Sequence, residues 1–221
     1  MSQSVVTPVT PASDTSASDI SVSGTAVSGT SASEPAVSVS GAPVESAPDS
    51  VDLVAEPTAP TAAELLEFVR NAAADTDLIA SLPLDPEGRT WVRLEGPGGS
   101  EAWLIAWPPG TGTGWHDHAE SFGAFATAAG ELKENSLAVR LPASGWKTLE
   151  LHEGVDRERQ LGAGRARAFG THHVHEVLNE SASEHAVSVH AYYPPLPLIR
   201  RFSRTGAVLR LEQVESPEDW Q

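Results

Sequence analysis

The chain has 221 residues, a formal net charge of -16 at pH 7 and no cysteine. Without cysteine there can be no disulfide or thiolate metal site, so any metal must be held by His, Asp or Glu. The acidic balance argues against nucleic acid as a partner. No stretch approaches the roughly 18 apolar residues of a membrane span, and no secretory signal is recognisable. We therefore expect a cytoplasmic monomer that binds neither nucleic acid nor membrane.

The first quarter of the chain, residues 1–58, has the composition of a disordered tail. Up to about Pro60 it consists mainly of Ser, Ala, Val, Thr, Pro and Gly, with seven acidic residues, no Lys or Arg and no aromatic residue. Such a segment buries too little apolar surface to offset its chain entropy. The folded domain is expected over residues 59–221.

A short helix opens the predicted domain and strands follow it. Thr61 and Glu64 have the spacing of a capping box, and apolar residues continue at helical spacing to about Ala74. Beyond Thr90 the sequence changes to brief apolar runs separated by Gly, Pro and Asn. These runs are WVRL, AWLIAW, FGAFATAAG, LAVRL, TLEL, RARAFG, HHVHEVL, AVSVHAYY and VLRLEQV. Seven to nine short strands indicate an all-β sandwich or barrel.

Six of the eight histidines fall in two clusters. His116 and His118 form the first, in the segment WHDH; the second comprises His172, His173, His175 and His190. Side chains alternate along a strand, so His116 and His118 share one face and Asp117 takes the other. Two imidazoles on one face can hold one metal ion, although an isolated HxH is also compatible with exposed strand histidines.

The spacing around these histidines resembles the cupin superfamily and, within it, the cysteine dioxygenases. Gly110 precedes His116 with five residues between, as in the first cupin motif, and His175 and Asn179 form the H(X)3N end of the second. The resemblance, which covers roughly Trp91 to Pro195, implies a cupin jelly-roll barrel. It also implies that His116, His118 and His175 hold Fe(II).

Gly123 stands where most cupins have a glutamate ligand. Loss of that glutamate is typical of the thiol dioxygenases, in which three neutral histidines hold the iron. The animal enzymes have a cysteine at this position, which cross-links to the active-site tyrosine. Because glycine cannot form this bond, the chain resembles the bacterial form.

A Ser-His-Tyr set on one strand is the third feature of the resemblance. Ser188, His190 and Tyr192 have i, i+2, i+4 spacing, which directs all three to one face of the strand, and Pro194 and Pro195 follow. The family places these residues in the barrel as catalytic groups. Without the histidine motifs, the same segment would be read as an ordinary amphipathic strand.

The other histidines have less defined roles. His173 lies on the same strand face as His175 and could be an alternative ligand or lie behind the ligands. His172 is expected to face the other way, and His152 and His185 to be solvated in polar loops.

The resemblance implies an enzyme that adds O2 to the sulfur of L-cysteine and gives cysteine sulfinate, with a small thiol and O2 as its partners. Zinc also accepts three histidines but has no redox chemistry, so a dioxygenase requires iron. Three alternatives remain: 3-mercaptopropionate or another small thiol as substrate, a non-catalytic metal-binding cupin, and a zinc or manganese cupin lyase or isomerase. The last class usually keeps the glutamate ligand that Gly123 replaces.

The substrate carboxylate requires a cation, and a guanidinium offers it a bidentate fork. The family places this arginine on the strand before the HxH strand, where Arg93 is the best match. Arg89 and Arg140 are the alternatives, and Arg93 could also be a surface arginine. Relatives with glutamine near this position prefer 3-mercaptopropionate. No glutamine occurs between Gln3 and Gln160, which favours cysteine.

Overall fold

The computed structural model describes residues 58–216, so the predicted tail lies almost entirely outside the described part. The described chain opens with the helix α1 (Ala62–Ala74), which begins where the sequence predicts. Thr61 caps it: its hydroxyl accepts from the Glu64 backbone N–H, and the Glu64 carboxylate accepts from the Thr61 N–H at 2.7 Å. A second, short helix, α2 (Thr76–Ala80), follows, and a 3-10 turn, η1 (Pro97–Gly99), comes later in the chain.

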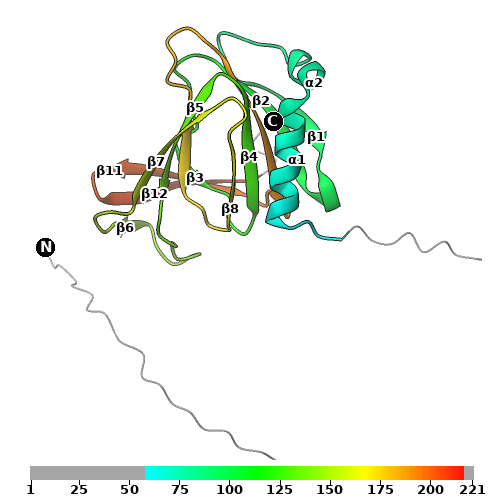
Figure 1. Cartoon of the computed structure of the whole chain (residues 1–221). Helices are drawn as coiled ribbons and strands as arrows, with labels where there is room; N and C mark the ends of the chain where they lie inside the picture. Colours follow the sequence, from blue (N-terminus) through cyan, green and yellow to red (C-terminus); the bar gives the residue numbers. More distant parts are fainter. Residues whose placement is uncertain (1–57, 217–221) are drawn as a thin grey trace, which may run out of the picture. The chain divides into compact units, whose positions relative to one another are not determined.

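Strands make up the rest of the regular structure, in two antiparallel sheets, and Figure 1 shows them closing around an interior. One sheet has the order β1-β2-β10-β4-β8, with strands β1 (Thr90–Glu95), β2 (Glu101–Trp107), β4 (Phe122–Ala129), β8 (Ala166–Phe169) and β10 (Ala186–Tyr193). The other has the order β6-β12-β11-β3-β9-β5-β7, with strands β3 (Trp115–Asp117), β5 (Glu131–Leu137), β6 (Thr148–Glu150), β7 (Asp156–Gly162), β9 (His175–Leu178), β11 (Ile199–Thr205) and β12 (Val208–Glu215).

The all-β class is confirmed, but the strand count differs from the expectation. The described residues form twelve strands rather than seven to nine. The run LAVRL is not a strand, because β5 occupies the preceding, more polar residues and ends at Leu137. The charged strands β7 and β11 were missed because their exposed faces carry Arg, Glu and Asp, which mask an apolar pattern.

Helix α1 packs on the outer face of the five-stranded sheet, which leaves the inner face free to line a cavity. Leu65 and Val69 are fully buried against the sheet. On β10, Val187, Val189 and Ala191 belong to this outer core, so the alternate residues turn inward. The outer face of the sheet is thus buried under α1, and its inner face lines the cavity.

No helix in the described part of the chain is long and apolar enough to cross a membrane.

Candidate metal centre

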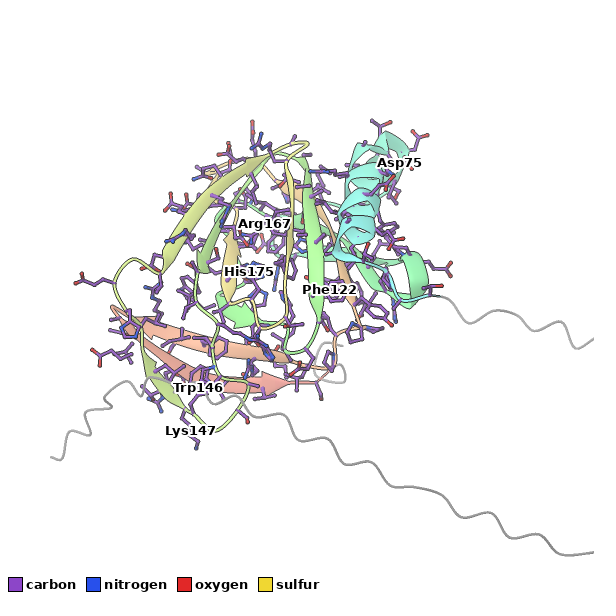
Figure 2. The ribbon with its side chains drawn as sticks, turned by 60° about the horizontal axis from the view of Figure 1, so that its bottom comes forward. Asp75, Phe122, Trp146, Lys147, Arg167 and His175 are labelled. Atoms are coloured by element: carbon purple, nitrogen blue, oxygen red, sulfur yellow. The ribbon has the colours of Figure 1, made fainter. Side chains whose placement is uncertain are left out.

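A cavity of about 400 Å³ opens into the barrel between the two sheets. Its walls are largely apolar, with Trp103, Ile105 and Val177 among them. Figure 2 shows His175 and Arg167 within the body of the barrel, whereas Asp75 and Lys147 lie at its edges. A concave, mostly apolar space with a few polar groups is the usual form of a small-molecule site.

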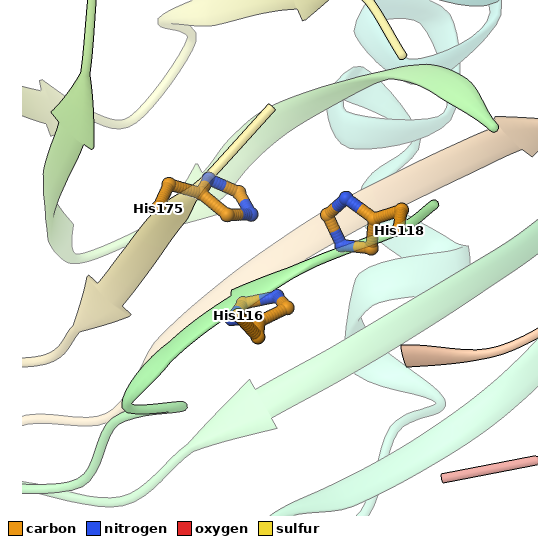
Figure 3. Close-up of side chains that lie close together, drawn as sticks. All are labelled: His116, His118 and His175. Carbon is orange, nitrogen blue, oxygen red and sulfur yellow. The ribbon is translucent and has the colours of Figure 1, made fainter. Parts of the chain in front are cut away.

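Three histidines meet at the floor of this cavity (Figure 3). His116 lies on β3, His118 just beyond its end and His175 on β9, which pairs with β3 so that His116 and His175 are register partners. The ring centroids are 4.9 Å apart for His116 and His118, 4.7 Å for His116 and His175, and 5.2 Å for His118 and His175. One nitrogen from each ring lies within 4.8 Å of the others. This spacing suits three ligands of a single metal ion.

The hydrogen bonds of these rings leave nitrogen lone pairs for a metal. The Nδ1 of His116 is 3.0 Å from the Gly114 carbonyl oxygen, and the Nδ1 of His175 is 2.9 Å from a Glu134 carboxylate oxygen. Because these oxygens only accept, both Nδ1 atoms carry the proton and both Nε2 atoms carry a lone pair. His175 Nε2 and His118 Nδ1 are buried without a hydrogen-bond partner. Buried nitrogens of this kind are normally satisfied, and a bound cation would satisfy a lone pair here.

Burial also keeps the rings of His116 and His118 neutral. It lowers the pKa of His116 and of His118 well below the usual value, and the neighbouring histidines lower both further. A neutral imidazole is the form that binds metal, so the site is poised for a cation near neutral pH.

Gly123 lies beside this cluster in a space that admits no side chain. A Cβ atom there would lie 2.5 Å from the Ala191 carbonyl oxygen and 2.7 Å from Cζ of Phe169. The ring of Phe169 is stacked on His118, with centroids 5.3 Å apart. A glutamate ligand at position 123 would therefore require the neighbouring backbone and Phe169 to move.

Ser188, His190 and Tyr192 form a continuous hydrogen-bonded chain on the inner face of β10. Ser188 Oγ is 2.8 Å from Nε2 of His190, and Nδ1 of His190 is 3.2 Å from Oη of Tyr192. The indole N–H of Trp107 donates to Ser188 Oγ at 2.8 Å, which extends the chain by one residue. The ring of Tyr192 lies 4.7 Å from that of His118, so this chain ends beside the histidine cluster.

The two titratable side chains of this hydrogen-bonded set, His190 and Tyr192, are held in their neutral forms. Burial, the largest cause, lowers the pKa of His190 to about 3. Burial and the Glu101 carboxylate raise the pKa of Tyr192. At neutral pH, His190 is therefore a neutral imidazole and Tyr192 a protonated phenol.

The two adjacent tyrosines face opposite ways, as strand geometry requires. Tyr192 lines the cavity, while Tyr193 packs with the outer core and has its ring 5.9 Å from that of Phe122.

Arg89, and not Arg93, lines the cavity. Arg93 stands opposite Trp103 in the β1–β2 register; its guanidinium lies 5.7 Å from the Trp103 ring and its side chain is exposed outside the cavity. Arg89 precedes β1, with its guanidinium 5.2 Å from the ring centroid of Trp107. Burial, followed by the charge of Arg201, lowers the pKa of Arg89. Arg140, the other alternative, is exposed after the end of β5.

Glu134 is a site residue that sequence reasoning missed. It is fully buried on β5, and its carboxylate contacts both His173 and His175. His173 is thereby turned toward Glu134, at 3.2 Å. The position of Glu134 in the sequence does not by itself reveal its contact with the two histidines. The available signal was the alternation of Leu132, Glu134 and Ser136, which puts an acid on the buried face of the strand.

A second buried acidic residue of the seven-stranded sheet, Asp117, lies between His116 and His118 in the sequence. Asp117 is fully buried, and its carboxylate accepts from the Arg200 guanidinium on β11 at 3.0 Å. Arg200 also contacts His172, which pairs with Glu120 at 3.1 Å and so points away from the cluster, as expected. This ion pair ties β3 to β11 and thereby holds the backbone that carries His116 and His118.

The remaining motif residues have local roles. The Asn179 amide donates to the carbonyl oxygens of Trp107 and Glu184, at 2.9 Å and 2.8 Å, and so closes the loops around the strand ends. His152 is exposed, whereas His185 is half-buried and its Nε2 lies 3.1 Å from the Asp85 carbonyl oxygen.

Two sheets closed around a site of three buried histidines define a metal-binding β-barrel of the cupin type. The family model for cysteine dioxygenase type I matches residues 47–205, well over half of the chain. The chain therefore belongs to the cysteine dioxygenase type I family.

Two curated relatives are similar over part of their length. The cysteine dioxygenase type 1 of Bos taurus is 29% identical over 115 residues, which cover 51% of this chain and 54% of the relative. That of Danio rerio is 30% identical over 116 residues, with the same coverage of both chains. The chain thus spans about half the length of the curated relatives that it matches.

Among solved structures, an oxalate oxidase is 21% identical, covers 52% of this chain and 55% of its own, and has a TM-score of 0.40. The protein TT1209 from Thermus thermophilus is 22% identical, covers 55% of this chain and 98% of its own, and has a TM-score of 0.39. The Cnp3 cupin domain of Schizosaccharomyces pombe is 10% identical, with coverage of 52% and 65% and a TM-score of 0.38.

Proposed function

We propose that the protein is an iron-dependent thiol dioxygenase that converts L-cysteine and O2 to cysteine sulfinate. The observation that carries this proposal is the adjacency of two groups in one cavity: the three buried histidines and the hydrogen-bonded residues that end at Tyr192, whose ring lies 4.7 Å from that of His118. The reaction balances without a further reductant, because both oxygen atoms of O2 enter the product. That the protein acts as a cytoplasmic monomer stays a prediction.

The residues His116, His118 and His175 would hold the metal. Imidazole ligands would leave a divalent ion its full positive charge, so Fe(II), when bound, would supply the redox chemistry of thiol oxygenation and a charge that favours the thiolate over the thiol, whose pKa is roughly 8.5. Zinc would fit the same ligands, so activity and not ligand geometry must identify the metal.

Arg89 would bind the substrate carboxylate. It is the arginine at the cavity that stacks on Trp107. The second arginine there, Arg201, donates to Glu215 at 2.5 Å and to the Thr113 carbonyl oxygen at 3.1 Å, so it is already engaged. A guanidinium next to apolar walls forms a stronger charge-assisted bond than one in water.

Tyr192 would donate a hydrogen bond to the reacting groups. Ser188 accepts from Trp107, which leaves the serine hydrogen free to bond Nε2 of His190. His190 then carries its proton on Nδ1 and donates it to the phenol oxygen. In this arrangement the phenol hydrogen is available to the cavity that Tyr192 lines.

The second candidate is a 3-mercaptopropionate dioxygenase. The observation that supports it is Gln213, which lines the cavity. A non-catalytic metal-binding cupin would not require the buried Ser188–His190–Tyr192 chain. The deciding experiment is O2 consumption by iron-loaded protein with cysteine or 3-mercaptopropionate, with His118→Ala as the control. Faster turnover of 3-mercaptopropionate would establish the second candidate, and no turnover of any thiol would leave the non-catalytic cupin.

A further inference from the structure

Glu134 is a buried carboxylate at the junction of four strands. One of its oxygens, Oε1, lies 2.9 Å from Nδ1 of His175 and 3.2 Å from Nε2 of His173. The other, Oε2, pairs with Arg167 and lies 3.6 Å from Nη1 of Arg159. A buried carboxylate needs partners, and each oxygen of Glu134 has two, so the loss of one partner still leaves both oxygens paired.

The contact with His175 determines which nitrogen of that ring faces the cluster. Oε2 of Glu134 pairs with Arg167 and Arg159, and Oε1 faces Nδ1 of His175. A carboxylate oxygen held in this way accepts hydrogen bonds, so the proton of His175 resides on Nδ1. Its Nε2, buried and without a partner, therefore presents a lone pair toward His116 and His118.

The contact between Glu134 and His175 also places a carboxylate next to a site whose three proposed ligands are all histidines. Position 123, where a glutamate would bind the metal directly, is closed by Phe169 and the Ala191 carbonyl. Glu134 instead lies one hydrogen bond behind His175. A carboxylate behind a histidine ligand fixes the ring and raises the basicity of its ligating nitrogen.

We infer that Glu134 is a positioning residue of the metal centre: its carboxylate fixes the tautomer and basicity of His175, and so strengthens metal binding without touching the metal. The inference rests on the metal site of the proposed function, but it does not depend on thiol oxidation. The competing explanation is an ion pair with Arg167 and Arg159 that only ties β5 to β7 and β8.

The test measures the affinity for Zn²⁺ by competition with a chelator in the full chain. Glu134→Gln, which keeps the shape but not the charge, should weaken Zn²⁺ binding by about 10- to 100-fold. Glu131→Gln on the same strand is the matched control, since Glu131 is exposed, and should bind as the parent does. Arg167→Met breaks the outer ion pair without touching His175 and should change the affinity much less.

A folded Glu134→Gln variant with parental Zn²⁺ affinity would overturn the inference, and so would an equal loss in Arg167→Met. Should Glu134→Gln fail to fold, ¹⁵N NMR of the zinc-loaded parent decides: we expect the His175 proton on Nδ1 and the metal on Nε2. Metal on Nδ1 would refute the inference. A parent chain that binds no Zn²⁺ would overturn the metal centre itself, which is a different failure from unchanged binding in Glu134→Gln.

Discussion

The guanidinium of Arg89 lies 5.2 Å from the ring centroid of Trp107, at the wall of the cavity that holds the three histidines. Arg93, four residues later, covers the Trp103 ring from an exposed position. The two arginines therefore offer a matched pair for testing how the substrate is held.

We predict that Arg89→Ala raises the Michaelis constant for cysteine at least about tenfold. A charge-assisted hydrogen bond contributes roughly 1.5 to 3 kcal/mol, and about 1.4 kcal/mol corresponds to a factor of ten. Steady-state O2 consumption measures this constant. Arg93→Ala should leave it unchanged, and cysteamine, which has no carboxylate, should not distinguish Arg89→Ala from the parent. An unaltered constant for cysteine in Arg89→Ala would remove that residue from the substrate site.

Metal binding should depend on His118 and His175 but not on His173. The first two belong to the cluster of three histidines, whereas His173 lies in a second group, with His175 and Glu134, and its Nε2 is 3.2 Å from the Glu134 carboxylate. Metal analysis of His118→Ala and His175→Ala after reconstitution with iron should show near-complete loss. His173→Ala should retain most of its iron. If His173→Ala lost iron and His175→Ala kept it, the third ligand would be His173.

Tyr192→Phe should keep its iron and reduce turnover by roughly two decades, because a positioned proton donor contributes about 10² to 10⁴ in rate. Tyr193→Phe is the natural control, since its ring packs against Phe122 on the other face of β10. Turnover and iron content are measured on the same preparations. Parental turnover in Tyr192→Phe would reduce the Ser-His-Tyr chain to a packing feature.

Acid should destabilise the metal-free protein through its buried histidines. The pKa of His190 is lowered to about 3 and that of His173 to about 4, chiefly by burial, whereas an unfolded histidine titrates near about 6.5. Below that value the unfolded chain binds protons that the native state does not. As the pH is lowered, the free energy of unfolding should then decrease by up to about 1.4 kcal/mol per pH unit for each such histidine.

Urea unfolding in the presence of a chelator, between about pH 7 and about pH 5, measures this slope. Glutamates stay largely ionised in that range, so histidines dominate the change. The matched variant is His190→Gln, which should have a shallower slope than the parent. Equal slopes in the two proteins would show that His190 does not titrate differently on unfolding.

Much of the site was predictable because it follows local strand geometry. Ser188, His190 and Tyr192 lie on one face of β10. His116 on β3 and His118 just beyond its end follow the same alternation, so local extended geometry puts each set of side chains together. The capping box of Thr61 likewise depends on residues three apart, and the structure has its helix where the sequence indicated.

Only the tertiary structure decided which residues from separate strands meet. The sequence favoured Arg93 on β1, with Arg89 just before that strand as an alternative. Alternation cannot say which of the two lines the cavity, since that depends on strand register and on where the cavity ends. Glu134 and His175 are 41 positions apart and meet because β5 pairs with β9. The sequence by itself determined the fold class and the kinds of ligand, because these follow from short-range pattern and residue chemistry. The choice of arginine and the carboxylate behind His175 depend on the long-range pairing of strands, which no local pattern encodes.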